Sequence, residues 1–364
     1  MNTLKAPHPS WIEIDLKQFK KNIGIIRAHI GGSLYCLPVK ANAYGHGLCA
    51  IGKAAEEAGV DYLGVAHLQE GIQLRQAGVK LPILVLGAIH EDQISELINY
   101  NMEFSISSKF KADLVASKCK EMNQSCRVHL EVDTGMQRTG VRYETALHLY
   151  EHIKTLGGVE VVGVYSHLAT ADSFADKQIE IFKALMQEPP FQGAKLIRHI
   201  ANSGGVTHFS KSHLDMVRPS LMTFGYASDS FKEIAPCFSL KSKVSYFKVV
   251  EKGEGVSYGH SYYTTKRTRI VTIPIGYGDG FRRALSNRGS VLIRGKKYPI
   301  VGTICMDQFM VDAGDDEMYV GDEVVLIGKQ GNEEILLTDI AKLCDTIPYE
   351  VLCLFNERLP RVYI

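Results

Sequence analysis

The sequence lacks the patterns that mark metalloproteins, disulfide-rich secreted proteins and membrane proteins. Its eight cysteines form no C-x-x-C pair, and none of its thirteen histidines belongs to an H-E-x-x-H motif. The longest apolar stretches, such as Leu81–Ile89, are too short to span a bilayer. The first ten residues contain two prolines and no apolar segment typical of a signal peptide. We therefore predict a cytoplasmic protein with no metal site, no structural disulfide and no membrane association.

The chain also lacks a charge of one sign. Its 41 Lys and Arg against 40 Asp and Glu give a formal net charge of +1. Such a balance provides no basic face for nucleic acid and no polybasic face for binding a membrane, so we expect neither as a partner. With 364 residues, of which 45% are hydrophobic, the chain is long enough for two domains.

In the first part of the chain, short apolar strands alternate with amphipathic segments of helical length. This alternation is typical of parallel strands that are buried on both faces, and about eight such units predict a (β/α)8 barrel. The expected strands are Leu34–Val39, Tyr62–Ala66, Ile83–Gly87, Glu103–Ile106, Arg127–Val132, Val159–Ser166, Leu196–Ala201 and Leu214–Val217. A doubly wound open sheet is the alternative, but it predicts a G-x-G-x-x-G turn that Val39–Gly47 does not contain. The barrel is favoured.

After about Ser230 the pattern changes to short strands separated by glycine turns. Examples of these strands are Ser242–Glu251 and Arg269–Ile275. We therefore expect an α/β chain, with a TIM-type barrel in residues 1–232 and a smaller, mainly antiparallel β domain in residues 233–364.

Polar residues follow several of the predicted barrel strands. Lys40 follows the first strand, Arg138 the fifth, His167 the sixth, Asn202 with Ser203 the seventh, and Arg218 the eighth. One such residue is ordinarily only a satisfied polar group, but the carboxyl ends of barrel strands meet at one mouth, where active sites lie. Burial at a strand end would favour the neutral amine of Lys40, which can form a Schiff base with a carbonyl cofactor. The alternative for Lys40 is a side chain that extends to solvent.

The segment Val39–Gly47, which reads VKANAYGHG, closely resembles the pyridoxal-phosphate attachment signature of the alanine racemase family. The resemblance covers nearly the whole chain. It continues in the segments Trp11–Asp15, Asp133–Gly140, Ser166–Ala169, Ala201–Ser203, Arg218–Pro219, Ser257–Gly259, Ile275–Gly280, Cys305–Gln308 and Pro348–Val351.

This resemblance implies a pyridoxal-phosphate enzyme that interconverts L-alanine and D-alanine and so supplies D-alanine for the bacterial cell wall. Lys40 would hold the cofactor and act as one base, and Tyr258 of the partner subunit would act as the other. Racemisation removes the Cα proton from one face and returns a proton on the opposite face, so two bases must flank the reacting carbon.

The resemblance also implies roles for the other residues. Arg218 would meet the pyridine nitrogen, His167 would orient Arg218, and Arg138 would contact the phenolic oxygen of the cofactor and the substrate carboxylate. Tyr277 and Met306 of the partner would close the substrate pocket, so the active form would be a homodimer. The remaining cofactor contacts would come from Tyr44, Asn202, Ser203, Tyr349 and the backbone amides of Ser220 and Leu221.

Two positions depart from the family pattern. Ser220 stands where the family often has glycine, a change that a backbone amide contact survives. Glu131 stands where many relatives have a carbamylated lysine that supports the arginine corresponding to Arg138. Strand alternation puts Glu131 and Asp133 on one face, so we expect the permanent charge of Glu131 to orient Arg138. The alternative is that Glu131 faces solvent or pairs elsewhere.

Three other functions are alternatives for a chain with these motifs. A pyridoxal-phosphate carrier protein would end after the barrel, whereas this chain continues through Tyr258, Tyr277 and Met306. A basic-amino-acid decarboxylase would place an acid, not Arg218, at the pyridine nitrogen. A racemase for serine or for a broader set of amino acids stays open, because a small pocket rejects an added hydroxyl by only ~10²-fold or less.

Overall fold

The structure, a computed structural model, describes residues 8–364. Residues 1–7, to which the prediction of no signal peptide largely refers, lie outside the described part. Within residues 8–364, no helix combines the length and apolar character needed to cross a membrane. The described chain forms two compact units, one of residues 18–43 and 47–235, the other of residues 8–17, 44–46 and 236–364.

The first unit is a closed barrel of eight parallel strands, as the sequence predicts. Parallel pairing runs around the ring and closes between its first and last strands, β2 and β10. The strands are β2 (Leu34–Pro38), β3 (Tyr62–Val65), β4 (Ile83–Val85), β5 (Glu103–Ile106), β6 (Cys126–Asp133), β8 (Val159–Tyr165), β9 (Ile197–His199) and β10 (Met216–Val217). Every residue of β3, β4 and β5 is buried, because the inner face fills the barrel and the outer face is covered by helices.

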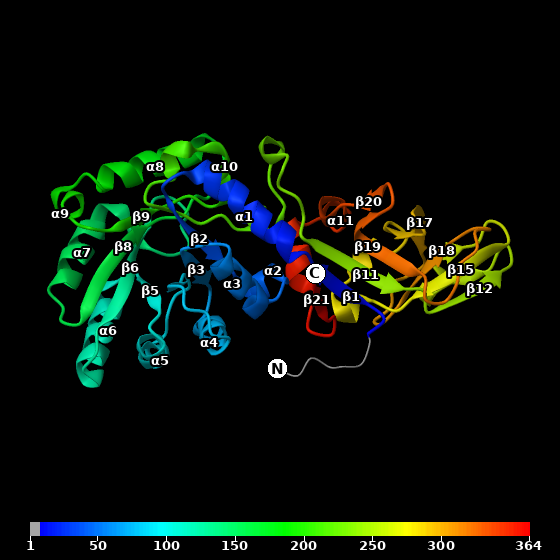
Figure 1. Ribbon diagram of the computed structural model, residues 1–364, viewed down its shortest axis with the longest axis horizontal. Coiled ribbons are helices and arrows are strands. Elements are labelled where there is room, and N and C mark those ends of the chain that lie inside the picture. Colours follow the sequence, from blue (N-terminus) through cyan, green and yellow to red (C-terminus); the bar gives the residue numbers. More distant parts are fainter. Residues whose placement is uncertain (1–7) are drawn as a thin grey trace. The chain divides into compact units, whose positions relative to one another are not determined.

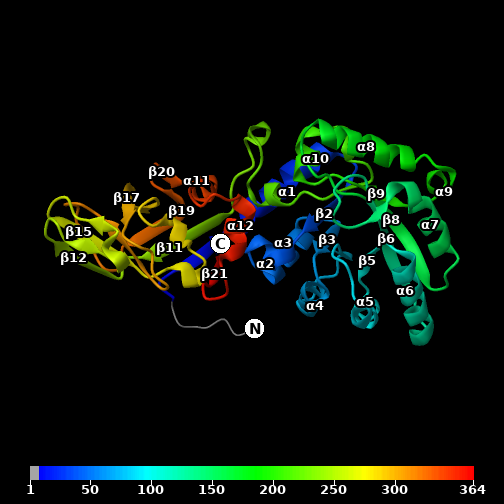
Figure 2. The same ribbon diagram turned by 180° about the vertical axis from the view of Figure 1, so that it is seen from behind.

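Helices lie outside the ring of strands in both views of this unit (Figure 1 and Figure 2). Their apolar residues recur at helical spacing, as in α1, where Phe19, Ile23, Ile26 and Ile30 are buried. The helices are α1 (Leu16–Ile30), α3 (Leu48–Glu57), α4 (Leu68–Gln76), α5 (Ile94–Asn99), α6 (Lys109–Met122), α7 (Ala146–Lys154), α8 (Ser173–Leu185), α9 (Pro189–Gln192) and α10 (Ser203–His208). Each βα turn therefore brings the end of a strand to the same mouth of the barrel.

The second unit is a mainly antiparallel sheet. Its path runs β12 (Tyr246–Val250), β15 (Thr268–Ile273), β18 (Phe309–Asp312), β17 (Lys296–Val301), β16 (Ser290–Ile293), β19 (Glu323–Gln330), β11 (Phe238–Lys243), β1 (Trp11–Ile14) and β21 (Arg361–Tyr363), with β20 (Glu333–Ile335) beside β19. Among the described residues of this unit, β1 and β21 are the one pair of strands that run parallel. A short hairpin of β13 (Gly255–Val256) and β14 (Tyr262–Tyr263) and the helices α11 (Leu337–Leu343) and α12 (Pro348–Leu354) complete the unit.

The chain enters and leaves this second unit more than once. The amino-terminal strand β1 pairs with β11 and β21, so it belongs to the antiparallel sheet although it precedes the barrel. Residues 44–46, which follow the first barrel strand, also group with the second unit. A boundary drawn at one point in the sequence does not describe such a division.

Candidate active site

The charges of three cationic side chains act on a neutral histidine at the carboxyl ends of the barrel strands. The half-buried His167 follows β8, and burial together with the charges of Arg218, Arg138 and Lys40 lowers its pKa to about 3. A histidine with that pKa is uncharged at neutral pH. The strand ends thus form an electropositive mouth, suited to an anionic ligand.

Lys40 opens an unusual turn. The four residues after it, Ala41 to Tyr44, all have left-handed backbone dihedrals with φ between 52° and 55°. This conformation costs about 1–2 kcal/mol for each L-residue, so the surroundings must hold it. The Glu70 carboxylate of α4 accepts the N–H of Ala41 at 2.7 Å, and its other oxygen accepts the N–H of Ala66 at 2.8 Å. Glu70 therefore ties the turn beside Lys40 to the end of the next strand.

Arg218 is buried beneath the mouth, immediately after β10. Its Nη2 donates to the carbonyl oxygen of Ser166 at 2.7 Å and lies 3.3 Å from Nδ1 of His167, while its Nη1 lies 2.5 Å from Nδ1 of His199. The guanidinium also lies over the ring of Tyr165, 5.2 Å from the ring centre. These contacts hold the side chain in one orientation.

Small polar groups gather where the last two barrel strands end. Ser203 Oγ accepts the backbone N–H of Ser220 at 2.9 Å and lies 3.2 Å from Ser220 Oγ. Asn202 caps α10 by accepting the N–H of Gly205. Leu221 begins a short 3-10 helix, whose first N–H groups have no partner within that helix. Hydroxyls and backbone amides of this kind can bind a phosphate.

Glu131 is buried on β6, as alternation predicts, but its environment is not that of a simple ion pair. Thr139 Oγ1 donates to its carboxylate at 2.7 Å, and none of the ion pairs among residues 8–364 joins it to the exposed Arg138. Burial raises the pKa of Glu131, and the hydrogen bonds of Thr139 and Tyr165 and the charges of Arg138 and Arg218 oppose that rise. That the charge of Glu131 orients Arg138 stays a prediction, and the sequence did not reveal how strongly burial acts on this carboxylate.

The second unit carries both tyrosines that are expected among the cofactor contacts. The Tyr44 and Tyr349 rings pack edge to face, with centroids 5.9 Å apart. Gly45, between Tyr44 and His46, has a φ of +80°, and a Cβ there would overlap the carbonyl oxygen of Leu352. Arg361 donates to the carbonyl of Gly45 at 3.1 Å.

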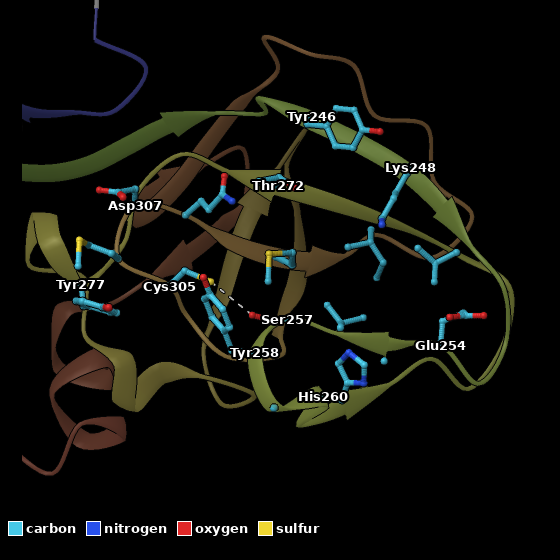
Figure 3. A pocket seen from close by; sticks show the side chains of 18 residues that line it. Tyr246, Lys248, Glu254, Ser257, Tyr258, His260, Thr272, Tyr277, Cys305 and Asp307 are labelled. Atoms are coloured by element: carbon cyan, nitrogen blue, oxygen red, sulfur yellow. Dashed lines mark hydrogen bonds between the residues drawn. The ribbon is translucent and has the colours of Figure 1, made fainter.

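Tyr258, Tyr277 and Met306 line one pocket of about 1060 Å³ in the second unit (Figure 3). Their exposed fractions are 75%, 44% and 53%, which is unusual for large apolar side chains. Ser257 and Cys305 line the same pocket, and Cys305 Sγ is 3.5 Å from Ser257 Oγ. The predicted site residues thus form two sets, one in the barrel unit and one in the second unit.

Sequence analysis missed several polar residues because they lie inside strands rather than after them. They are Glu103, His129, His199 and Tyr165, which are buried in the barrel. It also missed Glu70, which lies in the first turn of α4. The available signal was the presence of charged or imidazole side chains in strands otherwise predicted to be wholly apolar.

Comparisons with known proteins agree along the whole chain. The family model described as alanine racemase, N-terminal domain, matches residues 14–228, and that of the C-terminal domain matches residues 237–363. The alanine racemase of Symbiobacterium thermophilum is 40% identical over 370 residues, covering 99% of this chain and 98% of the relative. That of Carboxydothermus hydrogenoformans is also 40% identical, over 98% of this chain and 100% of the relative.

Solved structures show the same agreement. The alanine racemase of Clostridium difficile superposes with a TM-score of 0.93 at 36% identity, covering 99% of this chain and 97% of that one. The alanine racemase of Bacillus anthracis, solved with bound L-Ala-P, gives a TM-score of 0.91 at 34% identity over 99% and 96%. The chain therefore belongs to the alanine racemase family and is an amino-acid racemase.

Proposed function

We propose that the protein interconverts L-alanine and D-alanine with pyridoxal phosphate as cofactor, Lys40 and Tyr258 acting as the two bases. The observation that carries this proposal is the barrel mouth, where Lys40, Arg138 and Arg218 lie around the neutral His167. The names of the similar proteins support alanine as substrate, and so does the L-Ala-P bound to the Bacillus anthracis enzyme.

The residues present fit pyridoxal phosphate. Lys40 supplies an amine at the mouth, and Arg218 offers a buried guanidinium that donates only. The Ser203 hydroxyl and the backbone amides of Ser220 and Leu221 would hold the phosphate, with Asn202, Tyr44 and Tyr349 as further contacts. Arg138 would bind the substrate carboxylate, for which a guanidinium fork is suited.

When bound, the cofactor supplies an electron sink for the pair left on the substrate Cα after the proton departs. Lys40 Nζ and Tyr258 Oη would each take the proton from one face of that carbon and return it from their own side. Arg218 beside the pyridine nitrogen would leave that nitrogen unprotonated, because arginine stays charged and has no acceptor. A weaker sink suppresses side reactions such as transamination.

The second base would come from a second copy of this chain. Tyr258, Tyr277 and Met306 expose large side chains around one pocket, and such surfaces are typical of interfaces. We therefore infer a homodimer in which the β domain of each subunit completes the site on the other barrel. The cytoplasm, where D-alanine would be made for the bacterial cell wall, is the compartment that this function implies.

The test is proton exchange of each enantiomer in deuterium oxide. Tyr258→Phe keeps the ring but removes the hydroxyl that accepts the proton, and in this family the tyrosine serves L-alanine. Exchange into L-alanine should fall at least about a hundredfold more than exchange into D-alanine, within the range that one acid–base group contributes. Mass spectrometry of each isolated enantiomer measures both rates.

Equal loss of exchange in both enantiomers would contradict the division between Tyr258 and Lys40. Borohydride reduction followed by peptide mapping supplies the control for the cofactor, because it should leave the pyridoxyl group on Lys40 and on no other lysine.

A further inference from the structure

Four buried polar side chains form a continuous hydrogen-bonded chain through the barrel. Glu103 Oε2 lies 2.9 Å from Nε2 of His129, and Nδ1 of His129 lies 2.9 Å from Nε2 of His199. The last link joins Nδ1 of His199 to Nη1 of Arg218 at 2.5 Å. All four residues are at most 3% exposed. The chain runs from the start of β5 to the residue after β10, and so from the floor of the barrel to its mouth.

The hydrogen bonds of this chain have one direction only. Arg218 has no acceptor, so it must donate to Nδ1 of His199. A neutral imidazole that accepts at Nδ1 carries its proton on Nε2, and His199 therefore donates to His129, which in turn donates to Glu103. Burial and the charge of Arg218 lower the pKa of His199 well below its ordinary value, which keeps that ring neutral. Both rings are thus confined to the Nε2–H tautomer.

The residues around these four hydrogen-bonded side chains leave room for them and contact them. A Cβ at Gly163 of β8 would overlap Nδ1 of His129, so glycine leaves the space in which the ring lies. Tyr165 stacks on His199 with an interplanar angle of 12°. Arg127 Nη2 lies 3.0 Å from the other oxygen of Glu103. Tyr62 also faces that carboxylate, and burial with the charge of Glu103 raises the pKa of Tyr62.

We propose that Glu103 is a positioning residue for Arg218, which it orients through His129 and His199 from the opposite end of the barrel. A carboxylate accepts at both oxygens and donates at neither, so Glu103 sets the direction of every bond up to Arg218. The consequence for the cofactor rests on the proposed function. In that function, the bond from Arg218 Nη1 to His199 holds the guanidinium in place, so that its other nitrogens and its positive charge stay at the mouth of the barrel.

The test substitutes Glu103 by glutamine, which has nearly the same shape but a single acceptor oxygen. Cationic Arg127 should bind that oxygen, and the amide N–H2 would then face Nε2 of His129. His129 must respond by moving its proton to Nδ1, which forces the same change on His199 and points an N–H at Arg218. The Tyr62 hydroxyl can donate or accept and does not prevent this reversal.

Histidine-selective 15N spectra report the outcome directly. In the native holoenzyme both rings should be Nε2–H, and His199 should stay neutral between about pH 5.5 and 8, because burial and the charge of Arg218 lower its pKa well below the ordinary value. In Glu103→Gln both should become Nδ1–H, and kcat for racemisation should fall at least about tenfold with little change in KM, as for a lost charge-assisted hydrogen bond. Adding Arg127→Met frees the glutamine oxygen, so the double variant should regain the native tautomers and most of the activity.

Gly163→Ala tests the hydrogen bonds between Glu103 and Arg218 without changing a charge. It provides the test if Glu103→Gln does not fold. It should separate the two histidine rings, so that their native tautomer signals are lost. Gly64→Ala is its control and should leave both rings native. A Cβ there comes closest to the end of the Leu86 side chain, at 3.1 Å, and its other neighbours, Cys36 Sγ and Pro38 Cα, lie at an ordinary contact distance of 3.5 Å.

Unchanged tautomers in Glu103→Gln, or an Nδ1–H ring in the native protein, would overturn the proposal. Native Nε2–H tautomers that reverse in Glu103→Gln, in a protein that does not racemise alanine, would contradict the proposed function while leaving this hydrogen-bonded chain intact. The two failures are therefore distinguishable.

Discussion

His167 shows how one neutral side chain depends on the charges around it. Its pKa is lowered to about 3 in the folded protein, against about 6.5 for an ordinary histidine. Above about pH 6.5 the ring is neutral in both the folded and the unfolded chain, so it adds no pH dependence. As the pH falls from 6.5 towards 3, only the unfolded chain takes up this proton, and the free energy of unfolding must decrease.

We therefore expect His167→Asn to unfold with a weaker acid dependence than the native protein. Removal of one such proton lowers the slope by at most about 1.4 kcal/mol per pH unit. Urea unfolding at several pH values between about 7.5 and 5 measures this slope. The variant keeps part of the slope, because His199 is also buried and neutral. The matched variant His148→Asn, on an exposed position of α7, should leave the slope as it is; identical slopes in all three proteins would exclude a neutral His167.

Glu131 offers a second residue-scale prediction. Glu131→Gln keeps an oxygen for Thr139 but removes the charge near Arg138 and Arg218. Loss of a charge-assisted interaction costs about 1.5–3 kcal/mol, so kcat/KM should fall by roughly 10- to 150-fold while cofactor binding persists. Thr139→Val is the comparison, because it removes the hydroxyl and leaves the charge, and its effect should be smaller.

The response of activity to bicarbonate distinguishes a glutamate at this position from a carbamylated lysine. The carboxylate needs no modification, so activity of the native protein should not respond to bicarbonate. Stimulation by bicarbonate, or full activity in Glu131→Gln, would show that Glu131 does not have this role.

At the scale of elements, the turn from Lys40 to His46 is the feature most dependent on its neighbours. Gly45 within it has a φ of +80° and lies against the backbone of α12, whereas Gly59 after α3 has a φ of +78° and open space around it. The two glycines therefore share a backbone conformation and differ only in their surroundings.

Alanine at these two glycines should have unequal effects. Gly59→Ala should lower the free energy of unfolding by only the left-handed strain, about 1–2 kcal/mol. Gly45→Ala adds an overlap with the carbonyl oxygen of Leu352, which backbone atoms cannot relieve. The free energy of unfolding should therefore fall by about 1 kcal/mol or more beyond the loss in Gly59→Ala, as is usual for overpacking. Equal losses in denaturant titrations would mean that the close approach at Gly45 does not constrain the turn.

At the scale of the whole molecule, the proposed shared sites predict complementation between inactive subunits. A Lys40→Ala subunit keeps Tyr258, and a Tyr258→Phe subunit keeps Lys40. If these are mixed under conditions that exchange subunits, about half of the dimers are hybrids and each hybrid has one intact site, so about one quarter of native activity should return. Racemase assays before and after mixing measure this recovery, and no recovery despite proven exchange would place both bases in one subunit.

Much of the fold and part of the site could be predicted without coordinates. The barrel strands alternate with amphipathic helices, and the strand ends carry Lys40, Arg138, His167 and Arg218, because burial on both faces demands apolar strands and leaves polar residues to their ends. The change to an antiparallel sheet after the barrel was visible in its glycine turns. These features depend on short-range patterns that a sequence displays directly.

Other features were decided only by tertiary structure. β1 joins the second sheet because its partners, β11 and β21, lie more than two hundred residues away in the chain. The charge of Glu131 depends on burial as well as on Arg138, and burial is a property of packing. Likewise, Glu103, His129 and His199 look like three unrelated polar residues in sequence, and become one chain only when barrel closure brings β5, β6 and β9 side by side. Local periodicity determines the elements, but hydrogen bonds and charges act through space, and the closed barrel sets which groups they join.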